Sequence, residues 1–140
     1  MAATHGPCGE KVGRAWDLEP ERARLADGRV LEGVTIRWLI SASDGAPTYA
    51  MRLFELEPGA VIPEHEHPWE HEIYVLKGSL KVTVEDAEYE LGPDMFIYIP
   101  PNARHGYVAS EEGAAFLCII PHRPSVREDE LPPCRGGGKA

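Results

Sequence analysis

The chain has 140 residues, of which 43% are hydrophobic, and this composition suits one compact domain with a core of about 100 residues plus tails. Its 14 Lys and Arg residues stand against 23 Asp and Glu residues, which gives a formal charge of -9. No basic block could neutralise a phosphate backbone, so nucleic acid and anionic membrane surfaces are excluded as expected partners.

The first part of the chain, residues 1–33, is expected to form an N-terminal extension with a possible edge strand or short helix. A single helical turn is possible over residues 19–25, where Pro20 stands at a position that can begin it. The residues from Met1 to Gly13 contain no basic start followed by an apolar run, which argues against a secretion signal.

From Val34 the apolar residues alternate with polar ones, and period two is typical of strands. Turn signals rich in Gly, Pro and Asp separate these runs at regular intervals, which predicts an all-β sandwich or barrel over residues 34–122. The segments 95–99 and 114–120 are apolar almost throughout, so we expect them to be buried on both faces or at a dimer seam. Residues 123–140 are rich in Pro, Gly and charge and are expected to form a flexible tail.

Cysteine usage and hydropathy predict the compartment. The three cysteines are widely spaced, which fits a reducing environment better than a disulfide framework: Cys8, Cys118 and Cys134. No run reaches the roughly 18 apolar residues that are needed to cross a bilayer. We therefore expect a cytoplasmic protein that does not associate with membranes.

Four histidines form the most distinctive pattern in the chain. His65, His67 and His71 fall within seven residues, and His105 follows the turn at residues 100–102. Side chains at i and i+2 of a strand share a face, so His65 and His67 can bind one ion. Because imidazole is the commonest protein ligand of first-row transition metals, the pattern predicts a metal site.

These histidines stand within a longer pattern. The stretch from Gly59 to Gly78 resembles the first cupin motif, GxxxxxHxHxxxExxxxxxG, and the stretch from Pro100 to His105 resembles the second, PxGxxH. The resemblance covers roughly residues 34–121 and implies an all-β, single-domain cupin double-stranded β-helix, which is a jelly-roll barrel. The chain is particularly similar to the small four-histidine manganese cupins of bacteria and archaea.

Two positions depart from the cupin motifs. His71 stands where most metal cupins have a glutamate ligand, so the resemblance implies four histidine ligands and no carboxylate. Glu72 is the alternative ligand, but consecutive strand residues face opposite sides, and we favour His71 on that ground. Asn102 replaces the glycine of the second motif, and because Asn tolerates positive φ, we expect the turn before His105 to survive.

The resemblance implies one divalent transition metal per chain, held by His65, His67, His71 and His105. Mn(II) is favoured, and Fe(II), Ni(II), Co(II), Cu(II) and Zn(II) are possible. Tetrahedral zinc would be closed by four histidines, whereas a six-coordinate ion would keep two open positions. The isolated His5 and His122 are not expected to be ligands.

Other side chains near the motifs are candidates for roles at the site. Tyr74 and Arg104 are candidates for contact with a substrate, and Trp69 either stacks on a substrate or packs as a plug. Cys118 is expected to be a small core hydrophobe. Four acidic residues are either acceptors for the imidazoles or a solvated strand face: Glu64, Glu66, Glu70 and Glu72. The apolar lining is expected from Met51, Leu53, Ile73, Val75, Phe96 and Phe116.

For function, we expect a metal-dependent oxidoreductase, dioxygenase-like or peroxide-using, that acts on a small, partly apolar molecule. No obvious general base lies within the motifs, so metal-centred chemistry is expected to dominate. One alternative is a Lewis-acid isomerase or lyase acting on a small oxygenated acid, which needs Tyr74 or Glu72 to face the pocket. Another is a non-catalytic cupin that binds a metal or small ligand. A homodimer that exchanges the strand at 34–40 or the segment before it is expected from the resemblance and from the exposed sheet edges.

Overall fold

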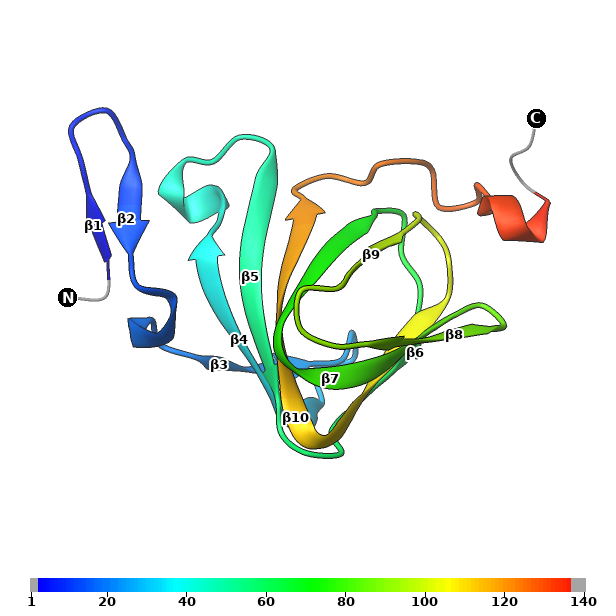
Figure 1. The fold of residues 1–140 in the computed structure, drawn as a ribbon. Helices are drawn as coiled ribbons and strands as arrows, with labels where there is room; N and C mark the ends of the chain where they lie inside the picture. The colour runs from blue at the N-terminus through cyan, green and yellow to red at the C-terminus, as the bar shows by residue number, and fades with distance from the viewer. Residues whose placement is uncertain (1–2, 137–140) are drawn as a thin grey trace.

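The computed structural model describes residues 3–136, which form an antiparallel β barrel with a separate N-terminal hairpin (Figure 1). The strands are β1 (Ala3–His5), β2 (Lys11–Gly13), β3 (Glu21–Arg24), β4 (Val30–Ile40), β5 (Tyr49–Leu56), β6 (Val61–His65), β7 (His71–Val84), β8 (Ala87–Leu91), β9 (Phe96–Ile99) and β10 (His105–Pro121). Short 3-10 turns within the described residues are η1 (Ala15–Asp17), η2 (Ala42–Asp44) and η3 (Pro133–Arg135). Among residues 3–136, no helix is long and apolar enough to span a membrane.

Two long strands organise the barrel. The main sheet has the order β3-β4-β5-β10-β7-β8, and β6 pairs with β10 while β9 pairs with β7. The first part of β10 pairs with β6, with His105 opposite His65, and the last part pairs with β5, with Ala114 opposite Leu56. β10 therefore belongs to both halves of the barrel. The predicted all-β, single-domain jelly roll is confirmed.

Alternating apolar side chains fill the interior of the barrel. Each strand sends every second side chain inward, and the largest buried members come from β4, β5, β7, β9 and β10. These side chains are Val34, Leu56, Ile73, Val75, Leu80, Val82, Ile99 and Phe116. The barrel core therefore has its centre on β7 and β10, the two strands that begin with histidines of the predicted metal site.

Gly78, the last residue of the first cupin motif, lies where β7 bends against β10. Its φ is +71°, and a Cβ added there would collide with the carbonyl oxygen of Gly113 on β10. Gly113 also has a positive φ, of +75°, and a Cβ there would approach the carbonyl oxygen of Leu56 to 2.7 Å. The two glycines let three strands approach closely at the end of the barrel remote from the histidines.

Of the two alternatives for the N-terminal extension, an edge strand and a short helix, the structure has the edge strand, and the helical turn over residues 19–25 is wrong. This segment contains β3, an edge strand that pairs with β4 and places Glu21 opposite Ile36. The turn at Asp27-Gly28, with Gly28 at φ +93°, returns the chain so that β4 can pair with it, and β4 begins at Val30 rather than at Val34. The open edge of β4 supplies backbone partners that one isolated helical turn would lack.

The C-terminal segment is held against the barrel up to residue 136, contrary to the expectation of a flexible tail from residue 123. Backbone hydrogen bonds join Ser125 N–H to the carbonyl of Pro68 (2.7 Å) and His122 N–H to that of Thr48 (3.0 Å). Pro132 is among the fully buried side chains. Residues 137–140 of the predicted tail lie outside the described residues.

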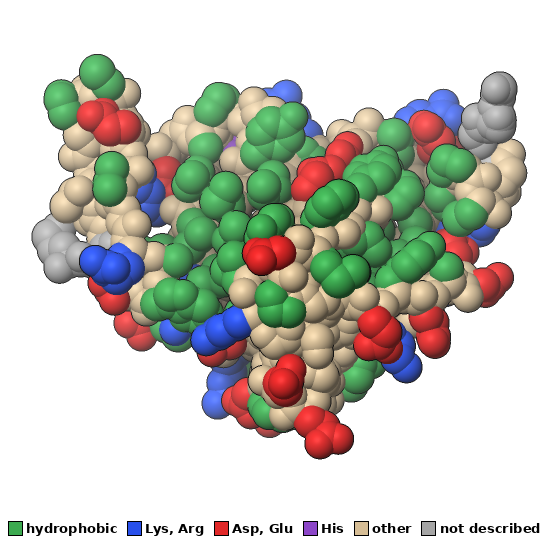
Figure 2. Space-filling view, viewed as in Figure 1, with side chains coloured by type: hydrophobic (Ala, Val, Ile, Leu, Met, Phe, Trp, Pro, Cys, Tyr) green, Lys and Arg blue, Asp and Glu red, His purple; other side chains and the backbone are tan. Residues whose placement is uncertain are grey.

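The outer face of the barrel carries many exposed apolar side chains, which gather over β5, β10, β7 and β9 (Figure 2). Phe96 is 75% exposed and Tyr98 is 54% exposed, although both are large and apolar in character. A covering partner would stabilise such a face. The homodimer and the exchange of strand 34–40 stay predictions, as does the cytoplasmic location.

Candidate metal centre and its cavity

The four predicted histidines come together at one end of the barrel. His65 ends β6, His67 lies in the loop that follows, and His71 and His105 begin β7 and β10. The ring centroids of His65 and His105 are 4.4 Å apart, those of His67 and His71 are 4.7 Å apart, and those of His71 and His105 are 5.0 Å apart. The cluster formed by His65, His67 and His105 could hold a metal ion, because its nitrogen donors lie within 4.8 Å of one another.

Backbone carbonyls set the tautomers of three of these histidines. The Nδ1 atoms of His65, His67 and His105 donate to the carbonyl oxygens of residues 63, 69 and 103, at 2.9, 3.1 and 2.8 Å. A carbonyl oxygen can only accept a hydrogen bond, so Nδ1 carries the proton in each ring. The Nε2 atom of each neutral imidazole therefore keeps a free lone pair, which is the form that binds a metal.

The free nitrogens fit a cation. His105 Nε2 is buried and has no hydrogen-bond partner in the structure, which is unfavourable for a polar atom. Nε2 of His71 lies 2.9 Å from Nε2 of His67. If His71 donates its Nδ1 proton to Cys118 Sγ at 3.1 Å, its Nε2 carries a lone pair. This lone pair then faces the lone pair on Nε2 of His67. A divalent ion between them removes the repulsion, so the donor set fits a metal.

Burial keeps the histidines neutral. It lowers the pKa of His67 from 6.5 to about 4 and that of His105 from 6.5 to about 3, because a charged imidazole loses its hydration in the barrel. The pKa of His71 is lowered further, first by burial and then by the neighbouring His105 and His67. Metal binding at neutral pH therefore needs no proton to be displaced from these side chains.

The two neighbouring candidates for the fourth ligand face opposite sides of β7. The His71 side chain is directed inward and only 5% of its surface is exposed. Glu72 is directed outward beside Glu70, and it pairs across the strands with Tyr98. Burial and the nearby Glu70 carboxylate raise the pKa of Glu72 from 4.5 to about 7. The alternation of the strand thus brings His71, and not Glu72, to the cluster.

The acidic residues predicted as imidazole acceptors have other partners. Glu64 contacts Arg104 (3.2 Å), and Glu66 contacts Arg135 (3.6 Å). The acceptors for His65, His67 and His105 are backbone carbonyls instead. Sequence analysis missed these acceptors because a carbonyl group carries no mark in the sequence.

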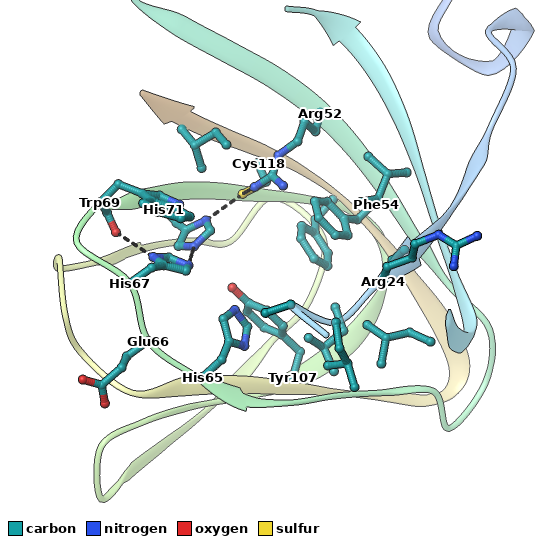
Figure 3. Close-up of a pocket in the computed structure, with 18 residues that line it drawn as sticks. Arg24, Arg52, Phe54, His65, Glu66, His67, Trp69, His71, Tyr107 and Cys118 are labelled. Carbon is teal, nitrogen blue, oxygen red and sulfur yellow. Dashed lines mark hydrogen bonds between the residues drawn. The ribbon is translucent and has the colours of Figure 1, made fainter. Parts of the chain in front are cut away.

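A cavity of about 460 Å³ opens beside the histidines (Figure 3). Phe54 and Phe116 stack in its wall with centroids 5.1 Å apart, and Trp69 stacks on His67 at 4.0 Å. The other lining residues are Ala23, Arg24, Leu25, Ala26, Leu31, Ile36, Arg52, Ile62, His65, Glu66, His71, Tyr107, Cys118 and Ile120. The cavity therefore suits a flat apolar or aromatic molecule whose polar group reaches the histidine cluster.

The predicted apolar lining is only partly right. Phe116 lines the cavity, whereas Leu53, Ile73 and Val75 are buried elsewhere and Phe96 is exposed. Met51 also lies outside the cavity. On β5 the inward positions are 52 and 54, which is the opposite parity to the one that the sequence favoured.

Tyr74 and Arg104, the predicted substrate contacts, do not line the cavity. The Tyr74 hydroxyl donates to Asp94 Oδ1 at 2.8 Å on the outer surface. Arg104 contacts Glu64 and Glu85, with Nε 3.2 Å from Oε1 of Glu64. Neither Tyr74 nor Glu72 therefore lines the pocket, so these two residues do not meet the condition that the sequence set for the Lewis-acid alternative.

Two polar residues of the cavity, Tyr107 and Arg52, were not predicted from the sequence. The Tyr107 side chain is 5% exposed and points its hydroxyl into the cavity (Figure 3), and burial raises its pKa well above 10. Tyr107 lies two residues after His105 on β10, so strand alternation could have placed it on the same face. Arg52 enters the cavity from β5, inside a run whose alternation favoured Met51 and Leu53.

Cys118 contacts His71 and Arg52 through its sulfur atom, whereas His5 and His122 lie outside the histidine cluster. Cys118 is 1% exposed, as expected for a core residue, but it also lines the cavity. Burial raises the pKa of its thiol. His5 Nε2 contacts Asp44, and His122 Nε2 donates to the carbonyl of Ala46 at 2.7 Å.

Asn102 ties the two histidine-bearing loops to the C-terminal segment. Its φ is +63°, as the turn requires, and its N–H donates to the carbonyl of His67 at 2.8 Å. Its side-chain amide donates to the carbonyls of Arg127 (2.9 Å) and Glu130 (2.6 Å). Arg135 Nη2 donates back to the Asn102 carbonyl at 2.6 Å. The residue that replaces the motif's glycine therefore anchors the segment from Arg127 to Arg135.

This anchor predicts different effects for two substitutions. Asn102→Gly keeps the positive φ but removes two side-chain hydrogen bonds, so we expect the free energy of unfolding to fall by about 2 kcal/mol. Asn102→Ala adds the strain of a left-handed alanine, about 1 kcal/mol more. Urea denaturation gives both values, and hydrogen exchange of residues 125–136 should quicken in both variants. Wild-type exchange in Asn102→Gly would contradict the anchor.

Comparisons with known proteins agree with this architecture. Residues 52–120 match the family model of the cupin domain. The structure of the polyketide cyclase RemF from Streptomyces resistomycificus is 34% identical, covers 88% of this chain and 87% of its own, and superposes with a TM-score of 0.75. The polyketide synthase CurC of Streptomyces cyaneus is 32% identical over 111 residues, which are 77% of this chain and 68% of that protein. The dimethylsulfoniopropionate lyase DddW of Ruegeria pomeroyi is 30% identical over 102 residues, 71% of this chain and 67% of that protein. The chain belongs to the cupin superfamily.

Proposed function

We propose that this cupin is a metal-dependent enzyme that closes a ring in a linear polycarbonyl substrate of the polyketide kind, without net oxidation. The observation that carries the proposal is the joining of a histidine cluster to an apolar cavity with aromatic walls. The similarity to a polyketide cyclase over 88% of the chain supports this substrate class. The proposal is a concrete form of the Lewis-acid alternative raised by the sequence.

In this proposal the metal would be held by Nε2 of His65, His67, His71 and His105. Burial lowers the pKa of three of these side chains, His67, His71 and His105, and so favours their neutral, metal-binding form. When bound, a divalent ion supplies Lewis-acid polarisation of a carbonyl oxygen and favours the enolate form of the substrate. The stacked rings of Phe54 and Phe116 hold the apolar part of the substrate and exclude water. The identity of the metal, with Mn(II) favoured, stays a prediction.

Tyr107 is the polar residue of this chain that is best placed to act on the substrate. Its buried phenol keeps its proton at neutral pH, since its pKa lies well above 10. It can therefore donate a hydrogen bond to the carbonyl oxygen on which negative charge grows as the ring closes. In the complete step, a methyl or methylene carbon loses a proton and bonds to a distant carbonyl carbon, whose oxygen takes up a proton and becomes a hydroxyl. The same carbon then loses a second proton, and the hydroxyl leaves with a proton as water, so two protons are released and two are taken up and no oxidant is consumed.

The oxidoreductase predicted from the sequence is the second candidate. An all-imidazole ligand set favours it, because a six-coordinate ion held by four histidines keeps two open positions for a substrate and an oxidant. The two candidates differ in one requirement. Ring closure with loss of water proceeds without oxygen, whereas an oxygenase needs oxygen or peroxide as a stoichiometric reactant.

We expect metal-loaded protein under nitrogen to convert an aryl-capped linear triketone into the corresponding phenylresorcinol. Mass spectrometry should show the loss of one water, and treatment with a chelator should abolish the conversion. Tyr107→Phe should lower kcat by about a hundredfold, the usual effect of losing one donor to a developing oxyanion. Tyr98→Phe, a matched change on the outer face, should leave kcat unchanged. Conversion that requires oxygen would favour the oxidoreductase instead.

A further inference from the structure

Arg52 is a cation inside the cavity that has no carboxylate partner among residues 3–136. It lies on β5 opposite Cys118 of β10, and its side chain reaches along the cavity wall toward Cys118 and His71 (Figure 3). The ion pairs of residues 3–136 use other arginines: Arg14, Arg29, Arg37, Arg104, Arg127 and Arg135. The guanidinium lies instead over the rings of Phe54 (4.8 Å) and Trp38 (5.5 Å).

The hydrogen-bonding capacity of Arg52 is mostly unused. A guanidinium has five N–H donors, and the hydrogen bond of Arg52 to another side chain is from Nη2 to Cys118 Sγ at 3.0 Å. Thiol sulfur is a weak acceptor. The Nε atom is buried and has no partner. A buried, unpaired donor on a charged group is costly, so the cavity is built to receive an acceptor at this point.

The surroundings of Arg52 favour an anionic acceptor. Glu66 lines the cavity, but its carboxylate points away from the interior (Figure 3) toward Arg135. Arg24, the other arginine of the lining, is at the mouth and donates to the carbonyl of Gly28. The interior therefore has a positive charge without a counter-ion, in a chain whose net charge is -9.

We propose that Arg52 binds the carboxylate of an apolar carboxylic acid, and that the cavity selects such acids over their neutral analogues. The planar guanidinium matches a carboxylate with two parallel hydrogen bonds, one of them from Nε. A single sulfur atom, Cys118 Sγ, separates Nη2 of Arg52 from Nδ1 of His71. An acid held by Arg52 therefore lies along Phe54 and Phe116, with its remaining polar groups near the histidine cluster. The assignment rests on the proposed function only in that it takes this cavity as the substrate site.

The test compares two probes of the same shape, naphthoate and naphthamide, by isothermal titration calorimetry. Metal-free protein is used so that the histidine cluster cannot capture the carboxylate through an ion. We expect naphthoate to bind at least about tenfold more tightly than naphthamide, as a charge-assisted pair of hydrogen bonds implies. Arg52→Gln should remove this preference, with naphthamide affinity changed by less than about threefold. Arg24→Gln, the same charge change at the mouth, should keep the preference.

A second variant guards against a simple loss of folding. Arg52→Lys keeps the charge but not the planar fork, so its preference for naphthoate should lie between those of the wild type and Arg52→Gln. A preference that survives in a folded Arg52→Gln variant would overturn the proposal, as would one that appears only after metal is added. If triketone cyclisation fails while the preference for naphthoate depends on Arg52, the proposed function is wrong and the carboxylate site stands.

Discussion

Replacing His71 with alanine is expected to lower metal affinity by more than the roughly 10-fold to 100-fold that loss of an outer partner causes, because a ligand itself is removed. The His71 side chain is buried, and its Nε2 lies 2.9 Å from Nε2 of His67. Glu72→Ala should leave the affinity unchanged, because that carboxylate is on the outer face beside Glu70. Metal content after dialysis against Mn(II) or Co(II) measures both effects, and the Co(II) spectrum reports the ligand set.

The same experiment distinguishes the four-histidine set from the three-histidine cluster of His65, His67 and His105. Full metal content in His71→Ala would mean that only three histidines bind the metal. A loss of metal content in Glu72→Ala alone would mean that Glu72 is the fourth ligand, as the glutamate is in most metal cupins. His122→Ala is a suitable control, since His122 contacts the carbonyl of Ala46 outside the cluster. Circular dichroism of each variant shows whether the barrel is intact.

Strand alternation explains why much of the metal centre could be predicted from the sequence. The choice of His71 over Glu72 needed only the rule that consecutive residues on a strand face opposite sides, and the structure places the two side chains accordingly. The same rule could have found Tyr107 from His105. Asn102 was expected to tolerate a positive φ, and its φ is +63°.

The lining of the cavity was less predictable because both faces of some strands are apolar. On β5, Leu53 and Phe54 are both buried, so alternation alone cannot tell which side chain enters the cavity. On β9, the apolar run predicted burial on both faces or at a dimer seam. Phe96 is exposed in the single chain, which contradicts the first of these and leaves the dimer seam a prediction. The partners of Asn102 in the C-terminal segment are backbone carbonyls, which composition does not reveal.

Acid is expected to destabilise the metal-free protein through its buried histidines, against an opposing contribution from Glu72, whose pKa is raised to about 7 in the folded state. Burial lowers the pKa of His67 to about 4 and that of His105 to about 3, whereas the unfolded chain has the ordinary value of 6.5. Between these values the unfolded state binds more protons than the folded state, so the free energy of unfolding falls as the pH falls. Above pH 6.5 both states are neutral and this contribution is fully present. For His105 alone the loss is on the order of 4 kcal/mol at the acid end of the window.

Urea denaturation of metal-free protein at a series of pH values measures this slope. In His105→Leu the slope between pH 6.5 and about 3 should be smaller, because one neutral imidazole no longer has to protonate on unfolding. His122→Gln, outside the cluster, should keep the slope of the wild type. Equal slopes in the wild type and in His105→Leu would show that the pKa of His105 is the same in the folded barrel as in the unfolded chain. A folded barrel that hydrates His105 in this way would not have the buried, unpartnered Nε2 that favours a metal ion at this cluster.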